Sequence, residues 1–153
     1  MLNQARQWKP NVTVAAVVER AGAFLLVEEQ TSAGIRYNQP AGHLEAGESL
    51  IDAVIRETLE ESARDFKPEA LLGVYQYHQP DSGVTYLRFA FTGTLSEPHA
   101  DRPLDSGILR ALWMPLAEIR ACSEQHRSPL LMRCIDDYLG GQRHPLQLLH
   151  HYN

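Results

Sequence analysis

The sequence predicts an α/β protein, with a mixed central sheet sandwiched between helices, in a single domain over residues 1–153. Strand-like and helix-like segments follow one another in the order β-β-β-helix-β-β-β-helix-helix, which favours helices on both faces of a sheet. The 153 residues are 44% hydrophobic and 22% charged, a composition that supports one hydrophobic core. No repeat, low-complexity tract or linker divides the chain, so we expect no second domain.

Three short strands are expected before the first helix. Residues 11–19 and 23–27 are rich in β-branched and aliphatic types, and the turn between them predicts a hairpin. Residues 28–34 are polar and predict a loop over a substrate cleft. Residues 35–39 predict a short strand that leads to a loop over 42–48, whose two glycines permit close backbone approach to a ligand.

One amphipathic helix follows this loop. Ser49 is a good N-cap, and Asp52, three residues later, completes a capping pattern. Apolar residues then recur at helical spacing, so one side of the helix should face a core. These residues are Leu50, Ile51, Val54, Ile55 and Leu59.

The second half of the chain predicts three more strands and two helices. Pro68 marks a break after the first helix, and Ser128-Pro129 is a helix-start signal. The loop over 96–107 is polar and contains proline. The expected strands cover 71–79, 84–95 and 108–114, and the expected helices cover 116–121 and 130–138.

Glu57, Glu60 and Glu61 place three carboxylates on one stripe of the first helix, because their spacing is i, i+3 and i+4. Like charges this close destabilise a bare helix, and the helix dipole disfavours anions in the last turns. A divalent cation among them would reverse that penalty, and hard oxygen ligands suit Mg²⁺, with Mn²⁺ as a substitute. Arg56 lies one turn from Glu60 and can brace the group. Taken alone, three such glutamates more often form a solvated acidic face.

The wider spacing changes that balance, because it resembles the Nudix box, a loop–helix–loop motif that holds metal and diphosphate. Gly42, Glu48 and the run Arg56-Glu57-x-x-Glu60-Glu61 stand at its fixed positions. The chain is therefore identified from its sequence as resembling the Nudix hydrolase superfamily. The resemblance implies a Nudix-type α/β/α sandwich, which agrees with the order of elements.

Three positions depart from the motif. Ala63 stands where glycine is usual, Arg64 where an apolar residue is usual, and Thr58 where an aliphatic residue is usual. The glycine normally takes the left-handed conformation that ends the helix. We therefore expect this helix to end differently or to run on. None of the three is an expected metal ligand.

The resemblance also implies roles for the site residues. It assigns Glu57, Glu60 and Glu61 to the metal, together with the carbonyl of Ala41, the residue before the motif glycine. A metal there would polarise a phosphoryl oxygen and activate water. We expect Glu48 to orient the cluster or its water. The catalytic set is thus Glu48, Arg56, Glu57, Glu60 and Glu61.

The general base is less well defined by the sequence. Many Nudix enzymes carry an acid six residues before the tryptophan that corresponds to Trp113, and here that position is Gly107. Asp105 is the nearest carboxylate and the possible base, with Glu97 and Asp101 as outside candidates. A glutamate of the motif could serve instead.

Segments outside the motif look like the NudJ-type bacterial phosphatases of this superfamily, over about residues 8–148. They include 12–15, 38–46, 87–89, 127–130 and 141–143. This likeness implies Mg²⁺-dependent hydrolysis of nucleoside tri- and diphosphates and of the pyrimidine pyrophosphate of thiamine synthesis, with release of orthophosphate. Weaker candidates for substrate binding are Gln39, His43, Arg88 and Arg127. Arg88 could snorkel or could reach a phosphate, and Arg127 lies next to a helix N-terminus.

Two other functions remain open. A narrower nucleotide-sugar or pterin-triphosphate pyrophosphatase would release pyrophosphate or two monophosphates. A non-catalytic Nudix-fold binding module would typically have lost its glutamates, whereas Glu48, Glu57, Glu60 and Glu61 are all present.

Composition limits which binding partners and which cellular location are expected for this protein. The formal net charge of −5 argues against a nucleic acid polymer as partner, although bound metal lets an acidic enzyme act on small polyphosphates. The first ten residues lack the apolar core of a secretory signal, and no apolar run reaches the length of a membrane span. Cys122 and Cys134 are expected as reduced thiols. We expect a cytoplasmic enzyme, as a monomer or homodimer.

Overall fold

The computed structural model describes residues 6–153. Residues 1–5, on which the expected absence of a secretory signal partly rests, lie outside the described residues. The strands are β1 Asn11–Ala16, β2 Glu19–Arg20, β3 Ala23–Thr31, β4 Gly34–Asn38, β5 Ala41–His43, β6 Phe66–His78, β7 Thr85–Leu95 and β8 Ile108–Pro115. The helices are α1 Leu50–Ser62, α2 Leu116–Ala121 and α3 Leu130–Leu139, with short 3₁₀ turns η1 Ser123–Gln125 and η2 Leu146–Leu148.

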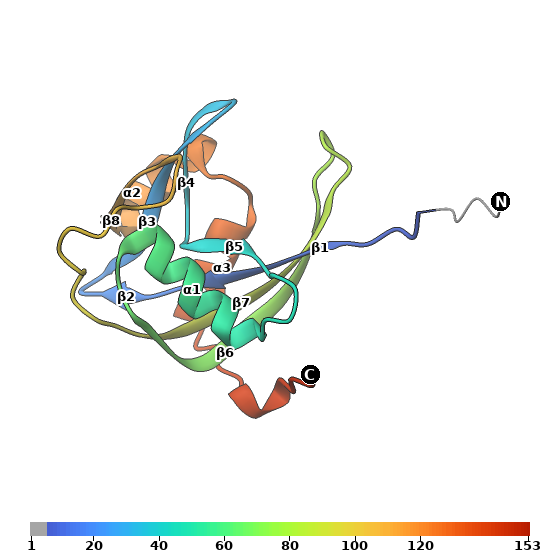
Figure 1. Cartoon of the computed structure of the whole chain (residues 1–153). Coiled ribbons are helices and arrows are strands. Elements are labelled where there is room, and N and C mark those ends of the chain that lie inside the picture. Colours follow the sequence, from blue (N-terminus) through green and yellow to red (C-terminus); the bar gives the residue numbers. More distant parts are fainter. Residues whose placement is uncertain (1–5) are drawn as a thin grey trace.

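The strands form two sheets and not the single sheet that the sequence predicts. The first sheet has the order β5-β1-β7-β6, and it is mixed because β1 runs parallel to β7 while its other pairings are antiparallel. In the second sheet, β3 pairs with β2, β4 and β8, all antiparallel. Helix α1 packs on β1, β5, β6 and β8, and α3 packs on β6 from the other side (Figure 1). The predicted α/β/α arrangement with a mixed sheet is confirmed.

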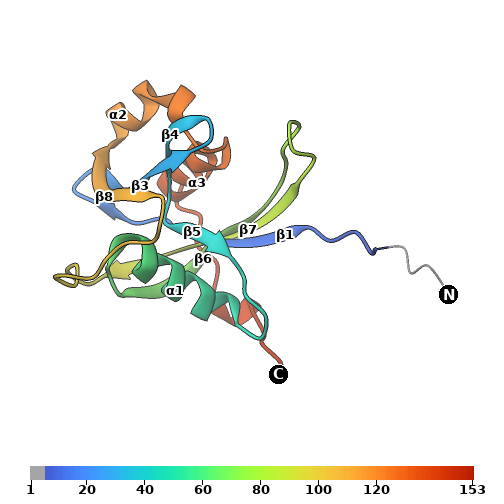
Figure 2. The same cartoon turned by 45° about the horizontal axis from the view of Figure 1, so that its top comes forward.

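Two hydrophobic clusters hold these layers together. Under α1, Val14 and Ala16 of β1 pack with Ala53 and Val54 of the helix and with Phe91 of β7. The other cluster lies beneath α2 and α3 and is formed by Val17, Phe24, Leu26, Leu72, Ala90, Met114, Ile119, Leu131, Cys134 and Ile135. Because Ala90 and Phe91 are neighbours on β7, their side chains point to opposite faces and each serves a different cluster. Figure 2 shows α1 and α3 on opposite sides of the strands.

The predicted hairpin of residues 11–19 with 23–27 is mostly wrong. Strand β1 ends at Ala16 and pairs with β5 and β7. Only Glu19 and Arg20 turn back onto β3, where they lie opposite Phe24 and Ala23. Residues 11–20 therefore supply β1, a central strand of the first sheet, and β2, an edge strand of the second. Composition alone does not show that this segment is divided between two sheets.

The predicted loop over 28–34 is correct only for Ser32 and Ala33, which form the turn between β3 and β4. Strand β3 continues to Thr31 and forms a hairpin with β4, and β8 lies along its other edge. Two neighbouring strands satisfy the backbone of these polar residues, so tertiary pairing outweighs their weak strand propensity. Pro68 likewise lies within β6, where the pairing with β7 shifts register between Pro68 and Ala70. A shift of this kind accommodates a residue that has no N–H.

The expectation that α1 ends differently from its relatives, or runs on, is wrong. Ala63 itself adopts the left-handed conformation, with φ 60° and ψ 22°, and its N–H donates to the carbonyl of Leu59 at 2.9 Å. Arg64 lies over the ring of Trp113, with its guanidinium carbon 5.4 Å from the ring centre. Thr58 is buried and donates its hydroxyl to the carbonyl of Val54 at 2.7 Å. Each of the three residues that depart from the motif therefore makes a hydrogen bond or a ring contact with a nearby residue.

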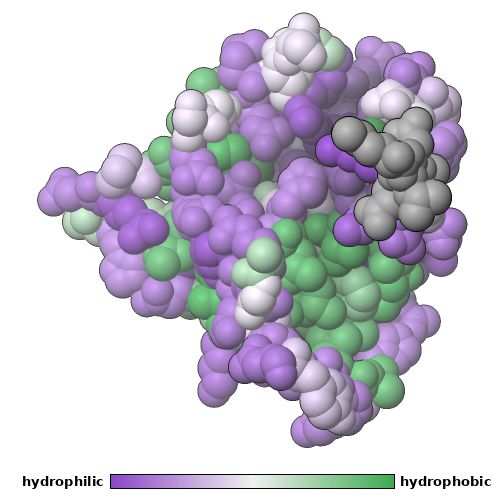
Figure 3. Space-filling model, turned by 45° about the vertical axis from the view of Figure 1, so that its right-hand side comes forward, coloured by the Kyte–Doolittle hydropathy of each residue, from purple (hydrophilic) through white to green (hydrophobic). Residues whose placement is uncertain are grey.

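The surface of the described residues is mixed. Figure 3 shows a hydrophobic area on one face, surrounded by hydrophilic residues. The exposed apolar side chains of the described chain include Trp8, Val74 and Leu148. No helix of residues 6–153 has both the length and the apolar character needed to cross a membrane. Cys122 and Cys134 are free thiols, as expected.

Candidate active site

Arg56 ties the loop before α1 to the helix. Its Nε and Nη2 donate to the two oxygens of Glu48 at 2.7 and 2.9 Å, a bidentate pair. Its Nη2 also donates to the carbonyl of His43 at 3.0 Å. Glu48 in turn accepts the N–H of Glu45 at 3.0 Å, and the guanidinium beside it lowers its pKa. This clamp fixes the loop against α1.

Arg56 also reaches the acidic stripe. Its Nη1 donates to Glu57 at 2.8 Å and to Glu60 at 3.2 Å. One cation therefore faces several carboxylates, which leaves the cluster with an excess of negative charge. Burial raises the pKa of Glu57 and of Glu60 in spite of this cation. An additional positive charge in this position would favour their ionised forms.

Gly42 is needed for the close approach of β5 to α1. A Cβ atom on Gly42 would lie 2.0 Å from Cδ of Glu57 and 2.2 Å from one of its oxygens. The Glu57 carboxylate thus occupies the space that any other residue at position 42 would fill. The pairing of Gly42 with Val14 holds the backbone there.

Glu61 lies deepest of the three glutamates, with a relative exposure of 6%. One of its oxygens accepts the N–H of Ala41 at 2.8 Å, which joins the C-terminal half of α1 to β5. Burial raises the pKa of Glu61 to about 8, and the nearby Glu29, Glu57 and Asp105 add to the shift. A buried carboxylate of this kind needs either a proton or a cation.

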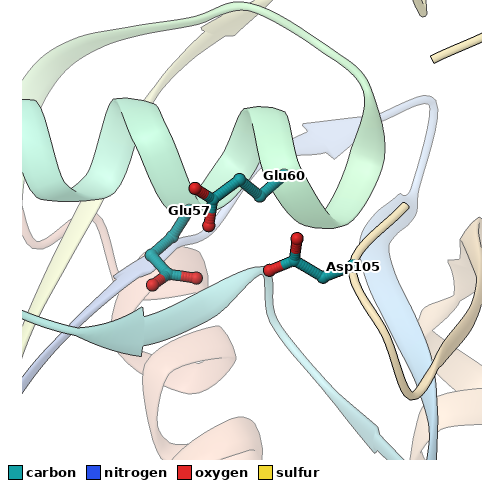
Figure 4. A group of neighbouring side chains, drawn as sticks. All are labelled: Glu57, Glu60 and Asp105. Carbon is teal, nitrogen blue, oxygen red and sulfur yellow. The ribbon is translucent and has the colours of Figure 1, made fainter. Parts of the chain in front are cut away.

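Asp105 completes the acidic group from a distant part of the chain. Ligand atoms of Glu57, Glu60 and Asp105 all lie within 4.8 Å of one another, and Figure 4 shows the three carboxylates gathered in one space. The N–H of Asp105 donates to the carbonyl of Glu60 at 3.0 Å, which fixes the loop before β8 against α1. The outside candidates, Glu97 and Asp101, are not part of this group. Oxygen donors alone make up the group, which suits a hard divalent cation.

A cleft of about 450 Å³ opens beside this group. Its walls come from the β3–β4 hairpin, from β5, from β6 and β7 next to their connecting turn, and from the start of α3. Ala41, Gly42 and His43 of β5 line it, so the loop that approaches Glu57 also forms a wall of the cleft. The volume is in the usual range for small-molecule sites.

The structure places the four weaker substrate candidates differently. His43, Arg88 and Arg127 line the cleft. Gln39 is 1% exposed and does not line it. The amide of Gln39 donates to the carbonyl of Leu131 at 2.9 Å and accepts from Arg88 at 3.0 Å, so both of its ends are occupied within the protein.

Two polar residues of the cleft were missed by sequence reasoning. Glu29 and Arg36 lie on the β3–β4 hairpin and line the cleft. One oxygen of Glu29 is buried without a hydrogen-bond partner among the described residues, and its nearest cation is Arg127 at 3.5 Å. No periodic pattern along residues 28–36 marks these two side chains, and the polarity of the segment suggested a loop.

The fold and the site together define a class of protein. An α/β/α scaffold brings a glycine-containing loop against the acidic stripe of a helix, beside a cleft of the size of a small molecule. This is the arrangement of a hydrolase that acts on phosphoric anhydride bonds, since a cation at the carboxylates would face phosphate groups in the cleft.

Comparison with known proteins identifies the family within that class. A sequence model of the NUDIX domain matches residues 8–134. Phosphatase NudJ of Escherichia coli K12 is 40% identical over 146 residues, which cover 95% of this chain and 94% of that protein. The chain therefore belongs to the Nudix family and is a Nudix phosphohydrolase.

Solved structures agree with this assignment. A Nudix hydrolase from Nitrosomonas europaea is 52% identical and superimposes with a TM-score of 0.92, over 94% of this chain and 98% of that one. The NUDIX domain of Shewanella oneidensis NrtR, solved in complex with ADP ribose, is 18% identical with a TM-score of 0.71, over 91% of this chain and 94% of that one. The second comparison concerns the fold alone.

Proposed function

We propose that this chain is a Mg²⁺-dependent hydrolase of nucleoside tri- and diphosphates and of related small pyrophosphates, such as hydroxymethylpyrimidine pyrophosphate, and that it releases orthophosphate. The observation that carries this proposal is the group formed by Glu57, Glu60 and Asp105 next to the cleft. The likeness to phosphatase NudJ supports the choice of orthophosphate as product. Mn²⁺ is expected to substitute for Mg²⁺.

The donor set fits such a cation. Glu57, Glu60 and Glu61 are proposed as its ligands, with the carbonyl of Ala41 from the facing strand. Gly42 leaves room for the Glu57 carboxylate, and Glu61 is buried with a raised pKa, as expected of an anion whose compensating charge comes from a cation. A bound divalent cation would polarise a phosphoryl oxygen and neutralise the charge that develops on it.

The chain's own residues would perform the remaining steps. Water attacks the terminal phosphorus, the bond from that phosphorus to the bridging oxygen breaks, and orthophosphate leaves. Burial raises the pKa of Glu60, and the neighbouring charge of Asp105 raises it further, which shows that the two carboxyl groups are close enough to interact. We propose that Asp105 accepts the proton of the attacking water, with Glu60 as its partner. Arg56 and Glu48 hold the loop in place while this occurs.

The test is hydrolysis of a substrate panel with separate detection of orthophosphate and pyrophosphate. With Mg²⁺, we expect orthophosphate from a nucleoside triphosphate and from hydroxymethylpyrimidine pyrophosphate. Glu61→Gln should lower kcat at least a hundredfold, because it removes a proposed metal ligand. Glu118→Gln is the matched control, since Glu118 is exposed on α2 and does not line the cleft, and it should keep wild-type activity.

Two results would contradict the proposal. Pyrophosphate or two monophosphates as the only products would favour the narrower nucleotide-sugar or pterin-triphosphate pyrophosphatase. Unchanged hydrolysis in Glu61→Gln would place the reaction elsewhere. The single domain, the cytoplasmic location, the choice between monomer and homodimer, and the absence of a nucleic acid polymer as partner stay predictions.

A further inference from the structure

The cleft contains a buried arginine that has no acidic partner. Arg88, on β7, has a relative exposure of 5%. No carboxylate of the described residues lies within 4.0 Å of its guanidinium, although four other arginines form such pairs. Removing a charged group from water costs several kcal/mol unless it is paired. An unpaired buried cation at the wall of a cleft is therefore a strong indication of an anionic ligand.

Neutral acceptors hold the Arg88 guanidinium in one orientation. Its Nη1 donates to Gln39 at 3.0 Å and contacts the sulfur of Cys134 at 3.8 Å, and its Nη2 donates to Asn38 at 3.1 Å. Gln39 is itself fixed by the carbonyl of Leu131. A guanidinium has five N–H groups, so these contacts leave Nε–H and one N–H of Nη2 without an acceptor among the described residues.

The charge of the surrounding cleft is positive, although the chain as a whole carries a net charge of −5. Arg36, Arg88 and Arg127 line the cleft, and Glu29 is the one carboxylate among its lining residues. A concave surface with an excess of one sign concentrates ligands of the opposite sign. The arginines of the cleft therefore favour an anionic ligand even without a metal at the acidic group.

This positive region lies beside the acidic group and is distinct from it. Thr13 of β1 lies opposite Arg88 on one side and opposite His43 on the other, so Arg88 and His43 are two strands apart. Strands are spaced by about 4.8 Å, which puts the two Cα atoms roughly 10 Å apart. An extended phosphate chain that reaches the acidic helix could therefore continue toward Arg88.

We propose that Arg88, with Arg36 and Arg127, forms a phosphate-binding subsite on the cleft wall, which holds a phosphate group of the substrate other than the one removed. The proposal rests on the proposed hydrolase function and deepens it, because it names triphosphates as the preferred substrates over the corresponding diphosphates. Asn38 and Gln39 are positioning residues for Arg88 in this subsite.

Ligand binding without metal tests the subsite separately from catalysis. The protein is titrated by calorimetry in EDTA with a β,γ-methylene nucleoside triphosphate and with the corresponding nucleoside. In EDTA the acidic group has no cation through which to bind phosphate. We expect the analogue to bind more tightly than the nucleoside by at least tenfold, and Arg88→Gln to weaken binding of the analogue by at least tenfold. Arg110→Gln is the control, because Arg110 is exposed, pairs with Glu28 and does not line the cleft.

A second variant guards against misfolding of Arg88→Gln. Arg127 is about half exposed, and Arg127→Gln should fold normally while it weakens binding of the analogue severalfold. With Mg²⁺, the preference for the triphosphate is measured as its kcat/KM divided by that of the diphosphate. Arg88→Gln should lower this preference, mainly by raising KM for the triphosphate.

The proposal is overturned if the nucleoside binds metal-free protein as tightly as the analogue, since the cleft then recognises the base. It is equally overturned if Arg127→Gln and every folded Arg88 variant keep wild-type affinity. These results are distinguishable from failure of the hydrolase proposal, which would appear as absence of phosphate release by the wild-type protein with Mg²⁺.

Discussion

At the scale of single residues, the site depends on the absence of a side chain at Gly42. The Glu57 carboxylate fills the space where a Cβ atom would lie, and this contact is with the end of a flexible side chain. A methyl group at position 42 would therefore displace Glu57 without preventing the fold. Because Glu57 is a proposed metal ligand, loss of its position should be costly, since ligands are needed within about 0.5 Å of the productive geometry.

We predict that Gly42→Ala lowers both Mg²⁺ affinity and kcat, each by tenfold or more, with a small change in the unfolding midpoint. The control is Gly47→Ala in the same loop. Gly47 has φ +79° and no atom within 4 Å of an added Cβ, so its variant should lose about 1 kcal/mol of stability through backbone strain and keep its metal affinity. Metal titration and thermal unfolding of both variants measure the two effects. Wild-type metal affinity in Gly42→Ala would refute the argument.

Single residues also show how far the sequence could predict the site. The glutamates of the motif and Asp105 could be named because their spacing matches a known pattern or because few acids lie near Trp113. Glu29 and Arg36 could not, because they enter the cleft only through the pairing of β3 with β4 and β8. Gln39 lies close in sequence to the cleft-lining residues of β5, but its amide accepts a hydrogen bond from Arg88 and does not face the cleft. This contact joins residues 49 positions apart, so the sequence did not indicate it.

At the scale of elements, the end of α1 shows how a motif can tolerate the loss of its glycine. The left-handed conformation costs a non-glycine residue roughly 1–2 kcal/mol, and Ala63 accepts this cost. Ala63 as a whole is 5% exposed, and burial of one methyl-sized group contributes about 0.8 kcal/mol. Burial thus offsets about half of the strain, which explains why alanine can replace glycine at this position.

The comparison of two alanines tests this balance. Ala21 also has a positive φ, of 50°, but it is exposed in the turn before β3. We predict that Ala21→Gly raises the free energy of unfolding by about 0.5–1 kcal/mol, since only strain is relieved. Ala63→Gly should change it by less than about 0.5 kcal/mol, because the lost burial offsets the relieved strain. Urea unfolding of the two variants measures both values. A gain in Ala63→Gly as large as that in Ala21→Gly would show that burial of the methyl group does not contribute.

Elements also mark the limit of prediction from local pattern. The start of α1 and both ends of α3 were predicted close to where they lie, because capping residues and 3.6-residue periodicity are local signals. The partners of β1 and the extent of β3 depend on strands far along the chain, so composition could not define them. The predicted hairpin failed for this reason.

At the scale of the whole molecule, the two hydrophobic clusters position the site without taking part in it. The cluster under α1 fixes the helix against β1, and the cluster under α3 fixes the opposite face. The acidic group lies where α1 meets β5 and the loop before β8, and the cleft opens between the β3–β4 hairpin and the start of α3. Stability and metal binding should therefore be coupled mainly through the buried Glu61, which lies on the helix and is a proposed metal ligand.

Glu61 makes the stability of the metal-free protein depend on pH. Its pKa is about 8 in the folded protein against an ordinary value of 4.5 in an unfolded chain. Between these two values the folded state holds a proton that the unfolded state has lost, so the free energy of unfolding falls as the pH rises. The raised pKa values of Glu57 and Glu60 act in the same direction. We predict a loss of up to about 4 kcal/mol between pH 5 and pH 8 in EDTA.

Bound metal should reverse this loss, because a cation replaces the proton that Glu61 gives up. We expect added Mg²⁺ to raise the unfolding midpoint strongly at pH 8 and little at pH 5, where protons compete for the same carboxylates. Thermal unfolding at pH 5, 6, 7 and 8, with EDTA or with Mg²⁺, measures both effects. Glu61→Gln, which has no proton to lose, should show a flatter pH dependence in EDTA. If the unfolding midpoint of Glu61→Gln depended on pH as steeply as that of the wild-type protein, the charge that destabilises the metal-free protein would not be on Glu61. That result would also argue against Glu61 as a ligand of the proposed metal.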